Sequence, residues 1–115
     1  MPIRIAVIGA GHVGATCAYA LVQSGVAAEI VLIDRDVARA EGEAMDIAHA
    51  VPFGPPVRVW AGDWSDCAGA TIVVLTAGAR QLPGQTRLDL LQANDEVIRD
   101  VVPRVVEHAP GAILL

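Results

Sequence analysis

The stretch Ile3-Arg4-Ile5-Ala6-Val7-Ile8-Gly9-Ala10-Gly11-His12-Val13-Gly14 decides the fold, together with Asp34. An apolar segment of strand length runs directly into the pattern G-x-G-x-x-G. A second apolar segment ends at Asp34, which follows Gly14 by 20 positions. Strand, glycine-rich turn, helix and distant acid in this order are typical of a unit that binds a dinucleotide.

Each residue of the motif has a mechanical role. Gly9 permits the tight turn, Gly11 lets the backbone approach a pyrophosphate, and Gly14 lets the helix pack on the strand. The helix N-terminus offers free N–H groups and a positive dipole end to the phosphates. Asp34 would accept hydrogen bonds from the adenosine ribose and repel a 2′-phosphate, which favours NAD over NADP. The motif alone leaves open a turn that binds nothing, or an FAD site.

Composition restricts the other function classes. The chain has 115 residues, and 54% of them are hydrophobic but only 3% aromatic, which suits parallel strands covered by helices on both faces. A net charge of −5 without charge blocks argues against nucleic acid or a membrane surface as partner. No signal peptide or bilayer-length apolar run is visible, so a cytoplasmic location is expected. Cys17 and Cys67 form no metal or redox motif, and we expect no metal site.

The pattern along the chain predicts an α/β fold. Strands are expected over residues 3–8, 29–33, 57–60 and 71–75 and from residue 112, and helices over residues 11–24, from 35 or 36 to about 50, and over 86–108. Pro103 is expected to kink or split the last helix, and residues 61–70 are expected to form a loop. This order predicts a Rossmann-type doubly wound parallel sheet, with the chain ending within the fifth strand. Ligands bind beyond the carboxyl ends of such strands.

A second informative stretch is Thr76-Ala77-Gly78-Ala79-Arg80-Gln81-Leu82-Pro83-Gly84-Gln85-Thr86-Arg87-Leu88-Asp89-Leu90-Leu91. Gly78 and Gly84 at its ends and Pro83 between them predict a hinged lid. Arg87 could pair with a substrate carboxylate or polarise a carbonyl oxygen. The residues alone leave open a structural alternative, in which Arg87 caps the following helix or forms an ion pair with Asp89 or a neighbouring residue.

This stretch resembles the active-site loop of L-lactate dehydrogenases, T-A-G-A-x-Q-x-P-G-E-T-R-L-D-L. Residues 40–50 (AEGEAMDIAHA), residues 62–64 (GDW) and the glycine motif are also similar to that family, so the resemblance covers the whole chain. Related malate dehydrogenases share most of the pattern but carry Arg where Gln81 stands. The departures are Arg80 for Asn, Gln85 for Glu and Trp64 for Tyr.

The resemblance implies NAD as cofactor and assigns roles residue by residue. Gln81 would face the methyl end of the substrate, and Arg87, as the catalytic residue of this chain, would polarise the substrate carbonyl. His49 does not match the family's catalytic histidine, and neither does His12. That histidine, its aspartate partner and a second arginine belong to the family's second half. The implied cofactor contacts are Gly9, Gly11, His12, Val13, Gly14, Asp34, Arg39, Trp64, Thr76, Ala77, Gly78 and Ala79.

We therefore expect residues 1–115 to be an incomplete NAD-binding domain whose substrate domain is absent from this chain. The expected protein is an NAD-dependent L-lactate dehydrogenase of glycolysis and fermentation that interconverts pyruvate and (S)-lactate. The resemblance implies a homotetramer or a dimer, with residues 40–50 at an interface. Residues 1–115 alone should be inactive. One alternative is malate dehydrogenase, if a one-residue shift presents Arg80 to the substrate. Another is a non-catalytic NAD-binding module, if the chain is complete.

Overall fold

The computed structural model describes residues 2–78 and 82–115. Its strands and helices alternate along most of the chain, as the sequence predicts. In chain order they are β1 (Arg4–Ile8), α1 (His12–Ser24), β2 (Glu29–Ile33), α2 (Val37–Ala48), the 3-10 turn η1 (Val51–Phe53), β3 (Arg58–Ala61), the 3-10 turn η2 (Trp64–Cys67), β4 (Ile72–Leu75), α3 (Arg87–His108) and β5 (Ile113–Leu114).

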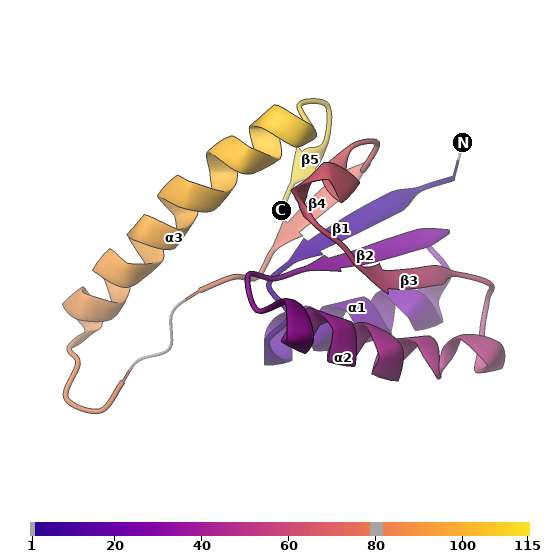
Figure 1. Cartoon of the computed structure of the whole chain (residues 1–115), viewed down its shortest axis with the longest axis horizontal. Helices are drawn as coiled ribbons and strands as arrows, with labels where there is room; N and C mark the ends of the chain where they lie inside the picture. The colour runs from indigo at the N-terminus through magenta and orange to yellow at the C-terminus, as the bar shows by residue number, and fades with distance from the viewer. Residues whose placement is uncertain (1, 79–81) are drawn as a thin grey trace.

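The strands form a five-stranded parallel sheet in the order β3-β2-β1-β4-β5 (Figure 1). The chain moves outward from β1 through β2 to β3, and then returns to β4 on the other side of β1. In the register of the sheet, Ile5 of β1 lies between Ile30 of β2 and Ile72 of β4. The order therefore reverses at β1, and the carboxyl ends of β1 and β4 flank the switch point where ligands bind in such sheets. The predicted fold class is confirmed.

The central strand is buried on both faces. Ile5 and Val7 pack in a cluster with α1 and α2, whereas Ala6 and Ile8 pack in a second cluster with the C-terminal half of α3. All four side chains are at most 3% exposed. Figure 1 shows α1 and α2 together on one side of the sheet and α3 on the other. Aliphatic side chains on both sides of one strand explain the apolar composition read from the sequence.

Local signals set most of the helix boundaries. Helix α1 ends at Ser24 and is capped by Gly25, whose φ of 71° lies in the left-handed region. Helix α2 begins after Asp36, whose carboxylate accepts a hydrogen bond from the Arg39 backbone N–H at 3.2 Å. Helix α3 begins after Thr86, which forms a capping box with Asp89.

Two features differ from the sequence expectations. Of the two expected effects of Pro103, the split does not occur, because α3 runs from Arg87 to His108 as one helix. Val101 and Val105 on either side of Pro103 are buried in the core, and this packing outweighs the lost backbone hydrogen bond. Residues 61–70 are also not all loop, because η2 forms there behind a second capping box.

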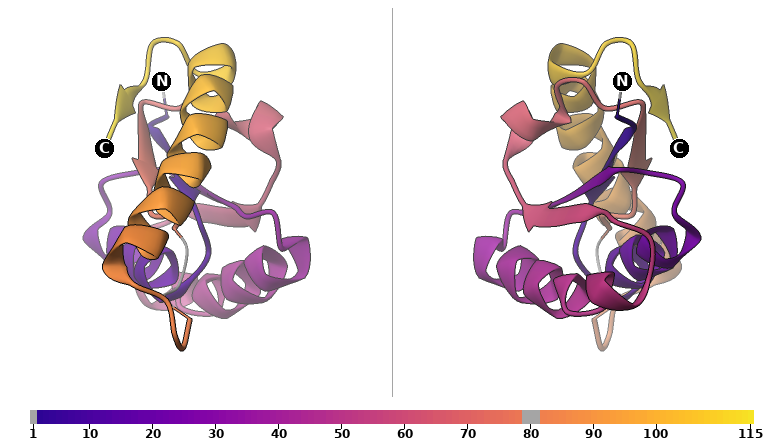
Figure 2. Two further views of the ribbon diagram at one scale, coloured as in Figure 1. Left: turned by 90° about the vertical axis from the view of Figure 1, so that its left-hand side faces the viewer. Right: turned by 90° about the vertical axis from the view of Figure 1, so that its right-hand side faces the viewer.

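Helix α3 packs on the sheet only through its C-terminal half. Val101 and Val105 are its buried residues, while the N-terminal half extends past the carboxyl edge of the strands (Figures 1 and 2). The N-terminal half carries exposed Leu88 and Leu91, which are 61% and 65% exposed. Among the described residues, no helix is both long enough and apolar enough to cross a membrane.

Candidate functional site

The turn after β1 requires two of its glycines. Gly9 has a φ of 101°, and a Cβ atom there would lie 2.7 Å from the Ala77 backbone nitrogen. A Cβ atom on Gly14 would overlap the carbonyl oxygen of Gly9 and lie 2.7 Å from Thr76 Oγ1. The fold itself therefore excludes larger residues at Gly9 and Gly14.

Gly11 is different, because nothing in the fold requires it to be glycine. Its φ of −74° and ψ of −167° suit any residue, and no atom beyond its two chain neighbours lies within 4 Å of the position of an added Cβ. The open space lies before the first turn of α1, where no side chain caps the helix and the first N–H groups have no intrahelical partner. A pyrophosphate fits this arrangement, because it needs backbone donors and no Cβ in front of them.

Asp34 is held in place beside this turn. Its Oδ2 accepts a hydrogen bond from the Ala10 N–H at 2.7 Å, and its Oδ1 accepts one from the Asp36 N–H at 2.8 Å. The carboxylate is half-buried at the end of β2. A carboxylate has about four lone-pair sites, so both oxygens retain acceptor capacity for ribose hydroxyls.

Thr76 connects β4 to the glycine turn. Its N–H donates to the Ile8 carbonyl at 2.8 Å, and its hydroxyl lies 3.0 Å from the carbonyl oxygens of Ile8 and of Gly9. The hydroxyl thus occupies the space beside Gly9 and Gly14 where side chains are missing. Thr76 shapes the turn in this way, and its direct contact with a cofactor stays a prediction.

The remaining predicted cofactor contacts are spread over the carboxyl edge of the sheet. His12 and Val13 are exposed at the start of α1, and Arg39 is exposed in the first turn of α2. Ala77 is half-buried and Gly78 is exposed after β4. Ala79 and Gln81 lie outside the described residues.

Trp64 faces the core more than the sequence analysis implied. It lies in η2, packs against the cluster under α3, and has the Arg104 guanidinium 5.6 Å from its ring centroid. Its place beside an adenine stays a prediction.

Two groups near Trp64 have shifted pKa values. The hydroxyl and N–H of Ser65 lower the pKa of Asp63. Burial raises the pKa of the Cys67 thiol to about 11.

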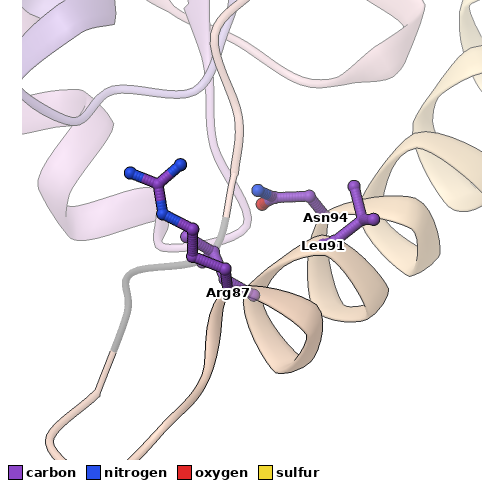
Figure 3. Close-up of a pocket in the computed structure, with 4 residues that line it drawn as sticks. Arg87, Leu91 and Asn94 are labelled. Atoms are coloured by element: carbon purple, nitrogen blue, oxygen red, sulfur yellow. The ribbon is translucent and has the colours of Figure 1, made fainter.

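Arg87 is available for a ligand. It is exposed at the first position of α3, and its side chain, like that of Asn94, projects from the helix toward the segment that leaves β4 (Figure 3). Leu90 and Leu91 line this shallow pocket with them. The Asp89 carboxylate accepts from the Thr86 N–H at 3.0 Å, and no ion pair joins Arg87 to any described carboxylate. The ion pair with Asp89, which the sequence left open, does not form.

Asn94 is a site residue that the sequence analysis missed. Its Oδ1 would lie 3.2 Å from a Cβ atom on Gly78, so its side chain packs beside the segment that leaves β4. The signal was present in the sequence as helical spacing, because Asn94 follows Arg87 by seven positions and therefore lies on the same side of the helix.

Comparisons with known proteins agree with this geometry. The model of the lactate/malate dehydrogenase NAD-binding domain matches residues 3–115. The chain belongs to this family. It is 50% identical over 109 residues to the L-lactate dehydrogenase of Synechococcus sp. (strain JA-3-3Ab), a match that covers 95% of this chain and 36% of the relative.

Solved structures of the family have the same fold. The minor L-lactate dehydrogenase from Enterococcus mundtii superposes with a TM-score of 0.92 at 41% identity, covering 98% of this chain and 36% of that one. The malate dehydrogenase from Archaeoglobus fulgidus in complex with NADH gives a TM-score of 0.89 at 38% identity, covering 97% and 39%. The chain thus spans little more than a third of its relatives and corresponds to their N-terminal, NAD-binding part. NAD is the cofactor of this domain.

Proposed function

We propose that this chain is the cofactor-binding part of an NAD-dependent L-lactate dehydrogenase that interconverts pyruvate plus NADH and (S)-lactate plus NAD⁺. Relatives of that name support the proposal. The observation that carries it is Arg87, whose exposed guanidinium has no carboxylate partner among residues 2–78 and 82–115. Because α3 runs antiparallel to the strands, its first turn lies on the side where their carboxyl ends meet.

The chemistry divides between the cofactor and the chain. NADH supplies the hydride when it is bound. The turn at Gly11 would bind the pyrophosphate, and Asp34 would orient the adenosine ribose. Arg87 would donate hydrogen bonds to the carbonyl oxygen of the substrate as negative charge develops there. The resemblance places the proton donor in a second half of the protein, so residues 1–115 alone should not turn over pyruvate.

Arg87 can be tested against a matched arginine on the same helix. Removing one donor to a developing oxyanion costs about 10²- to 10³-fold in kcat. In the complete protein, Arg87→Gln should lower kcat for pyruvate by that factor and leave the Kd of NADH nearly unchanged. Arg99→Gln is the control, because Arg99 is exposed and pairs with Asp95 one turn away. Equal kcat in the two variants would contradict the role of Arg87.

Gln81 should decide the substrate. A neutral side chain accepts the methyl group of pyruvate, whereas the second carboxylate of oxaloacetate would be buried without a partner at a cost of several kcal/mol. We expect kcat/KM for pyruvate to exceed that for oxaloacetate by orders of magnitude, and Gln81→Arg to reverse the preference. If the unmutated protein prefers oxaloacetate, Arg80 faces the substrate and the protein is a malate dehydrogenase.

We further propose that the protein is a cytoplasmic homotetramer or dimer, in which a second copy covers α2. Exposed apolar side chains on and beside this helix support the proposal, with Val37, Met45 and Phe53 at 59%, 64% and 90% exposure. Met45→Glu should lower the mass found by light scattering after gel filtration, and Gln23→Glu should not. An unchanged mass in Met45→Glu would contradict an interface at α2.

A further inference from the structure

One helical stripe of α3 faces the rest of the molecule. It consists of Leu90, Asn94, Val97, Val101 and Val105, spaced by three or four positions as a single helix face requires. Val101 and Val105 are buried, and Val97 packs against the same core cluster. Asn94 is the polar member of an otherwise aliphatic stripe, and it is half-buried.

The stripe changes from apolar at Val97 to polar at Asn94, and this change occurs where α3 passes the end of the sheet. Toward the C-terminus of the helix, the stripe packs on the core and is apolar. Toward the N-terminus, it faces the chain that leaves β4, because Asn94 Oδ1 lies 3.2 Å from the place of a Cβ atom on Gly78. A half-buried amide at this point has a polar main chain as its neighbour, not the core.

Asn94 and Arg87 share this side of α3. Figure 3 shows the side chains of Asn94 and Arg87 both projecting from α3 toward the segment that leaves β4. Both residues line one shallow pocket. The position of α3 relative to Gly78 therefore also determines where Arg87 stands relative to the segment that leaves β4.

We propose that Asn94 is a positioning residue of the active site. Its side chain packs beside Gly78, and this packing sets the spacing between the nicotinamide end of the cofactor and Arg87. Gly78 completes this contact, because a Cβ atom there would push the amide away. The inference rests on the proposed function, since it assigns Arg87 its catalytic role.

The test is a double-mutant cycle in the complete protein, with Asn94→Ala, Gly78→Ala and the combination of both. A displacement of about 1 Å at an active site can cost up to 10²-fold in rate. Asn94→Ala should lower kcat for pyruvate at least tenfold, while its KM for NADH and its melting temperature change little. Gly78→Ala should lower kcat by a smaller factor, because its Cβ displaces the amide by only a few tenths of an ångström. The double variant should be no slower than the slower single variant, because both changes break the same contact. Gln92→Ala, exposed on the same helix, should have no effect.

Several results would overturn the proposal. Multiplicative losses of kcat in the cycle would show that Asn94 and Gly78 act independently. A melting temperature that falls with unchanged kcat in Asn94→Ala would show a purely structural role. If neither pyruvate nor oxaloacetate is a substrate, the proposed function fails first. In that case, the fluorescence of bound NADH reports on the contact between Asn94 and Gly78. An unchanged emission spectrum and lifetime of bound NADH in Asn94→Ala would refute the positioning role.

Discussion

Replacing Gly11 by alanine should separate cofactor binding from folding. The backbone of Gly11 suits alanine, and the added Cβ would meet no protein atom within 4 Å. Loss of backbone freedom in the unfolded chain stabilises the variant by about 0.4–1 kcal/mol. Alanine is poorer than glycine at a helix N-cap, at a cost of roughly 0.5–1 kcal/mol. The two terms nearly cancel, so the free energy of unfolding should change by less than about 1 kcal/mol.

The effect on binding should be far larger. The Cβ would stand between the α1 N-terminus and the pyrophosphate, and would remove at least one hydrogen bond to a charged group, worth about 1.5–3 kcal/mol. The Kd of NADH should therefore rise roughly 10- to 100-fold, because each 1.4 kcal/mol corresponds to a factor of ten. Gly14→Ala should instead damage both properties, because its Cβ meets the Gly9 carbonyl and forces the turn to move.

The assay combines NADH titration by fluorescence with thermal unfolding of the complete protein. Gly111→Ala is the matched control, because its Cβ also meets nothing within 4 Å but the residue lies in the turn between α3 and β5, away from the site. It should leave the Kd of NADH unchanged and raise the free energy of unfolding by no more than about 0.4–1 kcal/mol. A Kd of NADH for Gly11→Ala within twofold of that of the unmutated protein would refute a pyrophosphate site at Gly11. A melting temperature of Gly11→Ala as low as that of Gly14→Ala would refute the claim that the fold does not need Gly11.

Three further predictions follow from individual contacts. We expect the unmutated protein to bind NAD about tenfold or more tightly than NADP because of one charged hydrogen bond at Asp34, and Asp34→Ser should narrow this preference. Equal Kd values of NAD and NADP in the unmutated protein would contradict this. Thr76→Val removes the hydroxyl beside the Gly9 carbonyl and should cost about 1–3 kcal/mol of stability and weaken NADH binding, whereas Thr76→Ser should restore both. Cys67, with its pKa raised from 9.0 to about 11, should resist thiol reagents at pH 8 in the folded protein. The Cys67 thiol ionises at a lower pH in the unfolded chain than in the folded protein, so the free energy of unfolding should fall as pH rises from about 9 to 11. Cys67→Ala should lack this part of the pH dependence.

The first half of the fold could be predicted closely because its signals are local. The bounds of β2, Glu29–Ile33, are those expected from the sequence, and α1 ends at Ser24 before the predicted Gly25 cap. Each signal acts within a few residues of the element that it ends. The capping box at Asp63 and Asp66 is a local signal of the same kind, and it sets where η2 begins.

Other features depend on packing that no short window contains. Pro103 argues against a continuous helix, and only the burial of its neighbours on the core shows why α3 continues. Asn94 has no motif around it, and it becomes informative once the inward face of α3 is known. The same holds for Thr76, whose hydroxyl bonds to carbonyls 67 and 68 positions earlier in the chain.

The three glycines of the motif show how far the structure can separate the demands of folding from those of binding. At Gly9 and Gly14 the neighbouring backbone already forbids a side chain, so their presence would be required even in a protein that binds nothing. At Gly11 the fold makes no such demand, yet the sequence still places there the residue that costs the most conformational entropy on folding. A glycine that the protein itself does not require has its reason outside the protein, in a ligand that must approach the main chain closely. Gly11 is therefore stronger structural evidence for the dinucleotide than the two glycines that the fold needs.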